Sequence, residues 1–389
     1  MKNHIASLKS HMEMFCEIIG ARPTGSASNE TAVDYAASIL QKNGLEVCKQ
    51  DFDCIDWINS GATLLVDNQN VPVVSAEYSL PCNINAEFIC VDTLELLIQT
   101  ELSGKIALLH GDLCSEPLMP KNFEFYNPDD HKQIIALLEE KNPAAIITVN
   151  PHKEHIIQDG DFNIPCAVVA TDMKNRFLQA ADRTACLSID TKRIPTKSYN
   201  VIATYGAGFD KICFFAHIDT KPTTPGALDN ASGVAVLLAF AETLSDKGYP
   251  FQIEIALLNG EDYYSTPGEV VFMKGIGAEY KLAINIDGVG LKNSATSISF
   301  YECPDEIQSV ILRCVGETAG IEQIEPWPMG DHMIFAMNGI PTVAITASKI
   351  FDLLETVIHS SDDEIKSIDF NILSEIVNLL ISYIKYRTR

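Results

Sequence analysis

The stretch Lys211-Ile-Cys-Phe-Phe-Ala-His-Ile-Asp219 decides the fold, because a run of apolar residues ends directly in a histidine and a carboxylate. Two further apolar runs end in the same way, within 253–262 and 283–288. Continuous apolar strands that alternate with helical patterns indicate a sheet covered on both faces. We therefore predict an α/β fold with a mixed, mostly parallel sheet and helices on both sides of it.

Polar side chains at the ends of these strands form the candidate site. His217, the pair Glu261-Asp262 and Asp287 each follow a strand, and Asp229 lies in a loop that opens a helix. Each has an ordinary explanation by itself: a hydrogen-bonded histidine, a solvated pair, a turn residue or a helix N-cap. Together they lie where open α/β sheets bind ligands, and charged residues seldom follow buried strands unless something pairs with them. The pattern therefore predicts a metal cradle.

The charge balance excludes several classes of partner. The 389 residues include 28 basic and 52 acidic side chains, which gives a net charge of −24 and a pI of about 4.6. Such a chain repels phosphate backbones and anionic lipids, so neither nucleic acid nor a membrane is an expected partner. No apolar run has the length of a membrane helix, and the N-terminal segment lacks a signal-peptide block. With 11 dispersed cysteines, expected to be reduced, we predict a cytoplasmic protein.

Several catalytic motifs are absent from the sequence. The chain contains no H-E-x-x-H, no G-x-S-x-G, no G-x-x-x-x-G-K-[ST] and no G-x-G-x-x-G. Their absence lowers the expectation of a zincin protease, a serine hydrolase of the α/β type, a P-loop phosphatase and a dinucleotide oxidoreductase.

The periodicity of apolar residues predicts the order of helices and strands. The region 51–100 is expected to form short strands broken by proline and asparagine, and the middle of the chain has the pattern of a small domain. Expected helices are 29–43, 131–141, 232–244, 304–318, 332–337 and 368–384, and expected strands are 144–149, 166–170, 200–204, 211–216, 252–258, 282–286 and 342–345.

A series of short motifs in the second half of the chain resembles the M28 family of co-catalytic zinc aminopeptidases and carboxypeptidases. Arg22-Pro-Thr-Gly25 also resembles the N-terminal segment of that family. Residues 58–195 resemble a protease-associated domain, a smaller β-rich α+β insertion, which leaves 1–57 and 196–389 as a discontinuous catalytic domain. The motifs, in order, are Asn200-Val-Ile-Ala203, Phe215-Ala-His-Ile-Asp219, Pro225-Gly-Ala-Leu-Asp-Asn-Ala-Ser-Gly233, Leu258-Asn-Gly-Glu-Asp262, Asn285-Ile-Asp-Gly288, Gly330-Asp-His332, Gly339-Ile-Pro341 and His359-Ser-Ser-Asp-Asp363.

The resemblance implies a role for each candidate residue. Asp229 would bridge two zinc ions, His217 and Asp287 would complete one site, and Asp262 and His359 would complete the other. Glu261 would be the general base, and Asp219 would orient the imidazole of His217. Imidazole and carboxylate ligands suit zinc and also cobalt or manganese. Two metal ions roughly 3.5–4 Å apart lower the pKa of a shared water toward neutrality.

Three positions depart from the family pattern. Asp262 stands where many members have Glu, Ile358 stands where many have a Tyr that helps to stabilise the oxyanion, and Gly330 replaces Ser before Asp331-His332. We expect Asp262 to bind metal with a shorter reach, and His332 to be structural or to line the pocket. Candidates to replace the missing tyrosine are Tyr263, Tyr264 and Tyr301.

The function predicted from these features is that of a di-zinc exopeptidase, an aminopeptidase that acts on short peptides. One alternative is a glutaminyl cyclase, which resembles this fold and uses a single zinc ion. A carboxypeptidase or amidase on the same metal pair is another, and a non-catalytic relative is the third. The sequence leaves the side-chain specificity open, as well as whether the chain forms a homo-oligomer.

Overall fold

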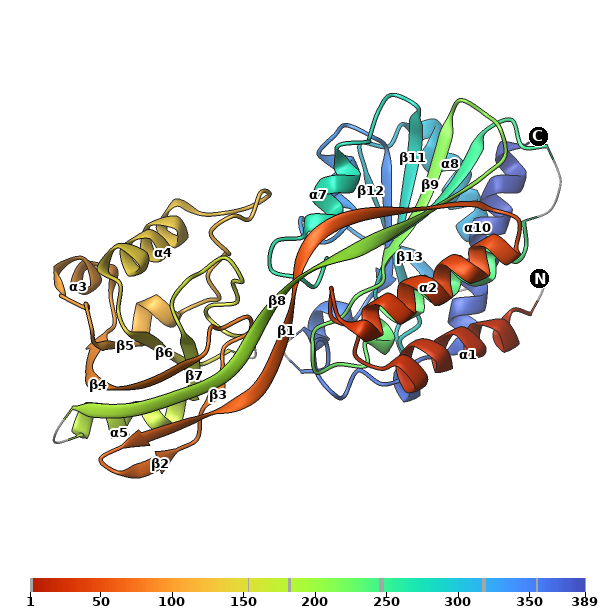
Figure 1. Ribbon diagram of the computed structural model, residues 1–389. Coiled ribbons are helices and arrows are strands. Elements are labelled where there is room, and N and C mark those ends of the chain that lie inside the picture. Colours follow the sequence, from red (N-terminus) through yellow and green to blue (C-terminus); the bar gives the residue numbers. More distant parts are fainter. Residues whose placement is uncertain are drawn as a thin grey trace. The chain divides into compact units, whose positions relative to one another are not determined.

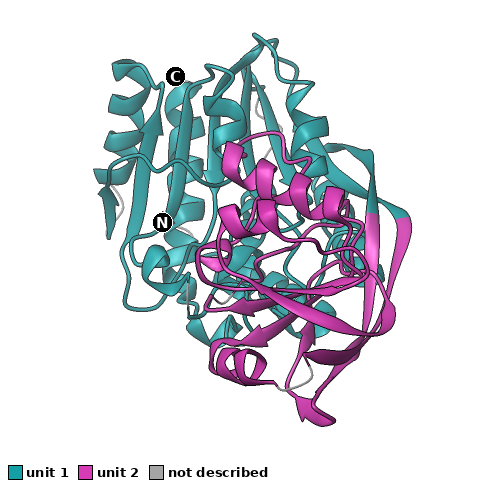
Figure 2. Cartoon of the chain, turned by 90° about the vertical axis from the view of Figure 1, so that its left-hand side faces the viewer, with its two compact units in different colours: residues 1–54, 196–389 teal, residues 55–195 magenta. Residues whose placement is uncertain are grey.

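The computed structural model describes residues 3–152, 154–180, 183–244, 248–316, 320–354 and 356–388. The chain divides into two compact units (Figure 2). Unit 1 consists of Met1–Cys54 and Thr196–Arg389, and unit 2 consists of Ile55–Pro195. This division lies within three residues of the domain boundaries predicted from the sequence.

The sheet of unit 1 is mixed and mostly parallel, as predicted (Figure 1). Its central strands β14, β11, β9 and β10 are parallel to one another, and β12 is antiparallel to β14. The C-terminal part of β8 is antiparallel to β10 at one end, and β13 is parallel to β12 at the other. The bounds are β8 (Thr184–Tyr205), β9 (Lys211–His217), β10 (Gln252–Leu258), β11 (Tyr280–Ile286), β12 (Thr296–Tyr301), β13 (Ile321–Gln323) and β14 (Thr342–Ala347).

Helices cover both faces of this sheet. Phe214 and Phe215 are neighbours on β9, so their side chains point to opposite faces. The Phe214 ring packs on Phe240 of α6 (Ser232–Ala241), and the Phe215 ring packs on Phe335 of α9 (Met333–Ala336). Every residue of α6 is buried, which is typical of a helix that is apolar all round. Helix α7 (Pro267–Met273) packs on β10 and α9.

The terminal helices of the chain complete the core of unit 1. α1 (Ile5–Glu13) and α10 (Phe370–Arg387) both pack on α6, and α8 (Asp305–Gly316) packs on α10. A π-helix, Met14–Ile19, continues α1, and α2 (Ala27–Lys42) begins where the Ser26 hydroxyl accepts the Asn29 N–H. The expected end of the helix 304–318 lies outside the described residues. No helix in the described ranges combines the length and the apolar character needed to span a membrane.

The register of the parallel strands brings their carboxyl ends to one edge. Leu258, the last residue of β10, lies opposite His217, the last residue of β9. On the other side of β9, Asn285 of β11 lies opposite Phe215, so Asp287 follows at the level of His217. The three strand ends picked out in the sequence therefore deliver their polar side chains to the same place.

Unit 2 has its own parallel sheet and its own apolar clusters. β4, β5, β6 and β7 are parallel neighbours, and the N-terminal part of β8 is antiparallel to β4. One apolar cluster includes Leu138 of α4, and another includes Phe88 and Phe177, whose rings are in contact. The elements are β1 (Glu46–Val66), β2 (Gln69–Val71), β3 (Val74–Ser75), β4 (Cys82–Val91), α3 (Leu94–Gln99), β5 (Ile106–Leu109), α4 (Asp129–Lys141), β6 (Ala145–Asn150), β7 (Cys166–Ala170) and α5 (Lys174–Gln179).

Two long strands replace the short strands expected where the units join. β1 runs unbroken for 21 residues, and its partner β8 runs for 22. The prediction of short broken runs between 51 and 66 is therefore wrong. β1 contains Asp, Asn, Ser and Gly, which are depleted in strands, so pairing with β8 outweighs local preference here.

The packing of α6 on β11 yields a stability prediction. A Cβ atom at Gly233 would lie 2.2 Å from the Ile286 carbonyl oxygen and 2.4 Å from the Asn230 Oδ1. Gly233→Ala should therefore lower the free energy of unfolding by about 1–3 kcal/mol or more, because the helix must shift away from the strand. Urea unfolding measures this change.

Gly316→Ala is the matched control, because a Cβ there meets nothing within 4 Å. It should leave the free energy of unfolding unchanged or slightly raised. Equal stability of the two variants would contradict the close packing of α6 on β11.

Candidate metal centre

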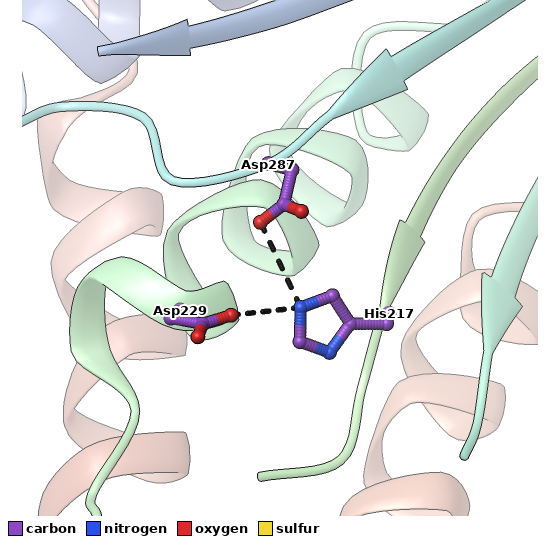
Figure 3. Close-up of side chains that lie close together, drawn as sticks. All are labelled: His217, Asp229 and Asp287. Carbon is purple, nitrogen blue, oxygen red and sulfur yellow. Dashed lines mark hydrogen bonds and ion pairs between the residues drawn. The ribbon is translucent and has the colours of Figure 1, made fainter. Parts of the chain in front are cut away.

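The end of β9 lies against two carboxylates from neighbouring elements (Figure 3). The His217 Nε2 atom is 2.9 Å from the Asp229 Oδ1 and 3.7 Å from the Asp287 Oδ1. Asp287 directly follows β11, and Asp229 lies in the turn Ala227–Ala231 that leads into α6. One donor atom from each of the three lies within 4.8 Å of the others, so the group could hold a metal ion.

A second group of the same kind shares Asp229 with the first. The other oxygen of this carboxylate, Oδ2, is 3.1 Å from the His359 Nε2, which is also 2.9 Å from the Asp262 Oδ1. These three donor atoms again lie within 4.8 Å of one another. The two oxygens of Asp229 therefore face one histidine each.

Asp229 is held in this position from both sides of its turn. The Asp363 carboxylate accepts the backbone N–H of Leu228 at 2.8 Å and that of Asp229 at 3.1 Å. The Asn230 side chain donates to the carbonyl of Ile286, the residue before Asp287, at 2.9 Å. The turn that carries the shared carboxylate is thus fixed both to the His359 loop and to the end of β11.

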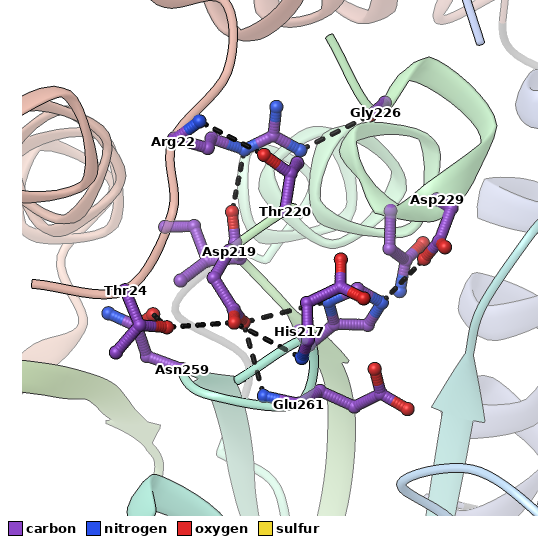
Figure 4. A network of polar contacts seen from close by, with 12 residues as sticks. Arg22, Thr24, His217, Asp219, Thr220, Gly226, Asp229, Asn259 and Glu261 are labelled. Carbon is purple, nitrogen blue, oxygen red and sulfur yellow. Dashed lines mark hydrogen bonds and ion pairs between the residues drawn. The ribbon is translucent and has the colours of Figure 1, made fainter. Parts of the chain in front are cut away.

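Asp219 joins the end of β9 to the loop after β10 (Figure 4). Its carboxylate accepts the backbone N–H of Glu261 at 3.3 Å and that of Asp262 at 3.2 Å. The Asp219 Oδ1 atom is 3.7 Å from the His217 Nδ1, on the side of the ring away from Asp229. Asp219 therefore fixes the backbone that carries the predicted base and one predicted ligand, and it lies within ion-pair distance of the imidazole.

The donor set suits divalent cations. Four carboxyl groups lie within 4 Å of the two imidazoles, and burying so many of them without a counter-charge is unfavourable. The Asp262 Oδ2 atom is buried and receives no hydrogen bond from any described residue. The side chains of His217 and Asp262 are 1% exposed, whereas Asp287 and His359 are 27% and 23% exposed, so the cradle has a buried floor and an accessible rim. A nitrogen and oxygen donor set of this kind fits zinc, and also cobalt or manganese.

The electrostatics reflect the crowding of charges. Burial disfavours the charged form of His217, but Asp219, Asp229 and Asp287 outweigh it and hold the pKa of this imidazole well above its usual value. Burial acts against the Asp229 carboxylate, yet both histidines keep its pKa low. Burial raises the pKa of Glu261 well above its usual value; Asp262, Asp331 and Asp287 add to the effect, and His217 opposes it.

The structure brings all the predicted site residues together in unit 1. His217, Asp229 and Asp287 form one group, Asp229, Asp262 and His359 form the other, and Glu261 and Asp219 adjoin them. His332 belongs to neither group: it is buried, and its Nε2 donates to the Trp327 carbonyl at 3.0 Å.

The three tyrosines proposed to stabilise the oxyanion are hydrogen-bonded or buried in the structure. The Tyr301 hydroxyl donates to the Trp327 carbonyl and accepts the Trp327 N–H, both at 2.8 Å, so its proton is already committed. Tyr263 and Tyr264 are buried, and their rings lie 4.3 Å apart.

Sequence reasoning missed a pair of buried acids beside the site. Neither oxygen of Asp331 receives an N–H or O–H donor from the described residues, and its carboxyl group interacts with that of Glu269 at the start of α7. Burial raises the pKa of Asp331 well above its usual value and that of Glu269 to about 7. Both shifts favour the neutral form of the carboxyl group, because burial disfavours the charged form.

Comparison with known proteins agrees with this fold. Residues 200–384 match the model of peptidase family M28. The chain is 23% identical over 379 residues to aminopeptidase YwaD of Bacillus subtilis, which aligns over 92% of this chain and 79% of YwaD. The crystal structure of BSAP, a zinc aminopeptidase from Bacillus subtilis, superposes with a TM-score of 0.78 at 19% identity, covering 98% of this chain and 94% of that one.

Residues 200–384 of this chain thus match peptidase family M28, as the motifs predicted. A probable leucine aminopeptidase of Trichophyton verrucosum is 26% identical over 210 residues, which cover 48% of this chain and 55% of that protein. The chain therefore spans about half the length of this relative. The resemblance of 58–195 to a protease-associated domain stays a prediction.

The buried histidine beside the site yields a pH prediction. Burial lowers the pKa of His332 to about 4, against the opposing effect of its hydrogen bond to Trp327. The unfolded chain, with a histidine pKa of about 6.5, binds this proton more readily. The contribution of neutral His332 to stability is therefore complete above pH ~6.5 and is lost as the pH falls toward 4, by up to about 3 kcal/mol.

His332→Gln is the test, because glutamine keeps an N–H for the Trp327 carbonyl and does not titrate. Urea unfolding of both proteins between pH 7 and pH 4 should show a steeper loss of stability in the wild type. Parallel pH profiles would show that His332 does not stay neutral in the folded chain.

Proposed function

We propose that the protein is a co-catalytic di-zinc aminopeptidase that hydrolyses the N-terminal peptide bond of short peptides. The observation that carries this proposal is the Asp229 carboxylate, whose two oxygens face His217 and His359 on opposite sides. A carboxylate in this position can bridge two ions. The aminopeptidases among the relatives support the choice of reaction.

One ion would be held by His217, Asp229 and Asp287, and the other by Asp229, Asp262 and His359. When bound, such a pair polarises the scissile carbonyl and makes water a nucleophile near neutral pH. Because the Asp287 and His359 side chains are partly exposed, a substrate can approach from their side of the cradle.

Glu261 is the proposed general base. Its carboxylate belongs to neither donor group, so it can accept a proton from water and return it to the leaving amine. Its backbone N–H donates to Asp219, which holds this part of the loop in place. Its pKa is raised by burial and by the neighbouring carboxylates. The basic form of Glu261 therefore depends on neutralisation of those neighbours.

The alternative reactions differ in the number of metal ions or in the substrate. A single-zinc glutaminyl cyclase needs one donor group, whereas two complete groups are present here. A carboxypeptidase or amidase would use the same centre. These enzymes differ from an aminopeptidase in that only the aminopeptidase requires a free N-terminal amine on the substrate.

The shared carboxylate predicts a pattern of metal content. Protein purified without chelator should contain about two zinc ions per chain by elemental analysis. Asp287→Ala and Asp262→Ala each remove a donor from one group and should leave about one ion. Asp229→Ala removes a donor from both groups and should leave less than one, because Asp229 belongs to both.

A content of one ion in the wild type would favour the cyclase. A content of one ion in Asp229→Ala, equal to that of the two other variants, would show that Asp229 does not bridge.

Replacement of the proposed base should separate catalysis from metal binding. Glu261→Gln should lower kcat on aminoacyl anilides by about 10²–10⁴-fold, because the proton acceptor is lost, and should keep the wild-type metal content. Glu322→Gln, an exposed residue of β13, is the matched control and should have wild-type kcat.

The same anilides with an acetylated amine should not be cleaved if the enzyme is an aminopeptidase. Cleavage of the acetylated substrates would point to an amidase. Full activity of Glu261→Gln would rule out the proposed base.

A further inference from the structure

Arg22 is a buried cation in the N-terminal segment of unit 1. Its side chain is 0% exposed and lies over the ring of Phe15. The guanidinium donates to four backbone carbonyls: Nε to Ile218 at 2.6 Å, Nη1 to Pro225 at 2.8 Å and to Gly20 at 3.4 Å, and Nη2 to Gly226 at 3.2 Å. Figure 4 shows this network beside the candidate metal centre.

Three of these carbonyls belong to the two segments that carry His217 and Asp229. Ile218 lies between His217 and Asp219, and Pro225-Gly226 leads into the turn of Asp229. One rigid guanidinium fork therefore holds the backbone on both sides of the 2.9 Å contact between His217 and Asp229. Burial lowers the pKa of Arg22, and the nearby carboxylates of Asp219, Asp363 and Asp229 oppose this effect.

One of the segments held by Arg22 has no room for a side chain at Gly226. Gly226 has a positive φ of 56°, and a Cβ there would lie 2.4 Å from the Asp229 carbonyl oxygen and 2.4 Å from the Thr220 Cγ2. The Thr220 hydroxyl in turn accepts the backbone N–H of Arg22 at 3.0 Å. Arg22 and the loop before Asp229 thus fit each other closely.

Thr24 supports the same centre by a separate contact. Its hydroxyl donates to the Asp219 Oδ2 at 2.8 Å, and Thr24 is 3% exposed. Asp219 also accepts the N–H groups of Glu261 and Asp262 and faces the His217 ring. The Thr24 hydroxyl therefore fixes the carboxylate that binds the loop after β10 and lies 3.7 Å from the His217 Nδ1.

We propose that Arg22 and Thr24 are positioning residues of the metal centre, which hold the segments of His217, Asp219 and Asp229 in the ion-binding arrangement. This inference rests on the proposed function. Neither side chain belongs to a donor group, so both act through other residues. A role in anchoring the N-terminal helices alone would give the same hydrogen bonds, and the test must separate the two roles.

The chain offers matched controls for both residues on β8 in unit 2. Arg193 donates to the carbonyls of Tyr78, Asp159 and Phe162, and the buried Thr191 hydroxyl donates to the Ser79 carbonyl at 2.8 Å. Arg22→Lys and Arg193→Lys each replace a planar fork by a point charge. Thr24→Val and Thr191→Val each remove one buried hydroxyl and keep the shape of the side chain.

The experiment measures the dissociation constant of zinc for the full chain by competition with a chromophoric chelator, at a temperature at which all variants are folded. Arg22→Lys and Thr24→Val should each weaken zinc binding by about 10–100-fold, the size found for residues that orient metal ligands. Both should also lower kcat. Arg193→Lys and Thr191→Val should lower only Tm and keep the zinc affinity of the wild type.

A lower Tm with unchanged zinc affinity and kcat in Arg22→Lys and Thr24→Val would overturn the inference and leave the proposed function intact. If Arg22→Lys does not fold, Thr24→Val decides, because it removes a single hydroxyl. A wild type that binds no zinc would overturn the proposed function, and the inference with it.

Discussion

The arrangement of unit 1 depends on one constraint: the two oxygens of the Asp229 carboxylate must each face a different histidine. His217 comes from the end of β9 and His359 from a loop 142 positions later in the chain, so neither can be moved without losing one side of the contact. Asn230 and Asp363 fix the turn of Asp229 to the end of β11 and to the His359 loop. The parallel register of β9, β10 and β11 then places the remaining carboxylates around it.

This arrangement concentrates negative charge in a place with little water. The carboxylates are kept together by hydrogen bonds from backbone N–H groups and by the histidines, while burial pushes the pKa of Glu261 upward. Asp331 adds to the same effect, and His217 opposes it. Such a site is a source of instability in the free chain, because like charges in a low-dielectric environment repel strongly. Binding of cations relieves this repulsion, so the interaction that the proposed function needs also stabilises the folded chain.

The central strands of unit 1 and the polar residues at their ends could be predicted from the apolar pattern, whereas His359 was assigned only through the resemblance to family M28. Buried parallel strands are short, continuous and apolar, and each one ends in the polar residue that matters, as at His217 and Asp287. The strand β1 has no such signal, because its pairing with β8 is a long-range property that a chain rich in Asp and Asn conceals. The contacts of Arg22 and Thr24 span about 195 to 204 positions of sequence, and an isolated arginine gives no indication of which carbonyls it will meet. Nothing in the sequence around Glu269 and Asp331 indicates that these two acidic side chains are buried in the folded chain.

The continuity of β1 and β8 from one unit into the other has a consequence for the order of folding. Both ends of the inserted unit leave unit 1 side by side, where Lys197 pairs with Asp51 and Asn200 with Gln50. Unit 2 is a contiguous segment and can complete its contacts once residue 195 has emerged from the ribosome. Helices α1 and α2 can make their contacts with α6 only after α6 has been synthesised. Once unit 2 is folded, its two ends are close together, because β1 and β8 pair with each other. Joining the two halves of unit 1 then costs less entropy than closing a flexible loop of the same length would.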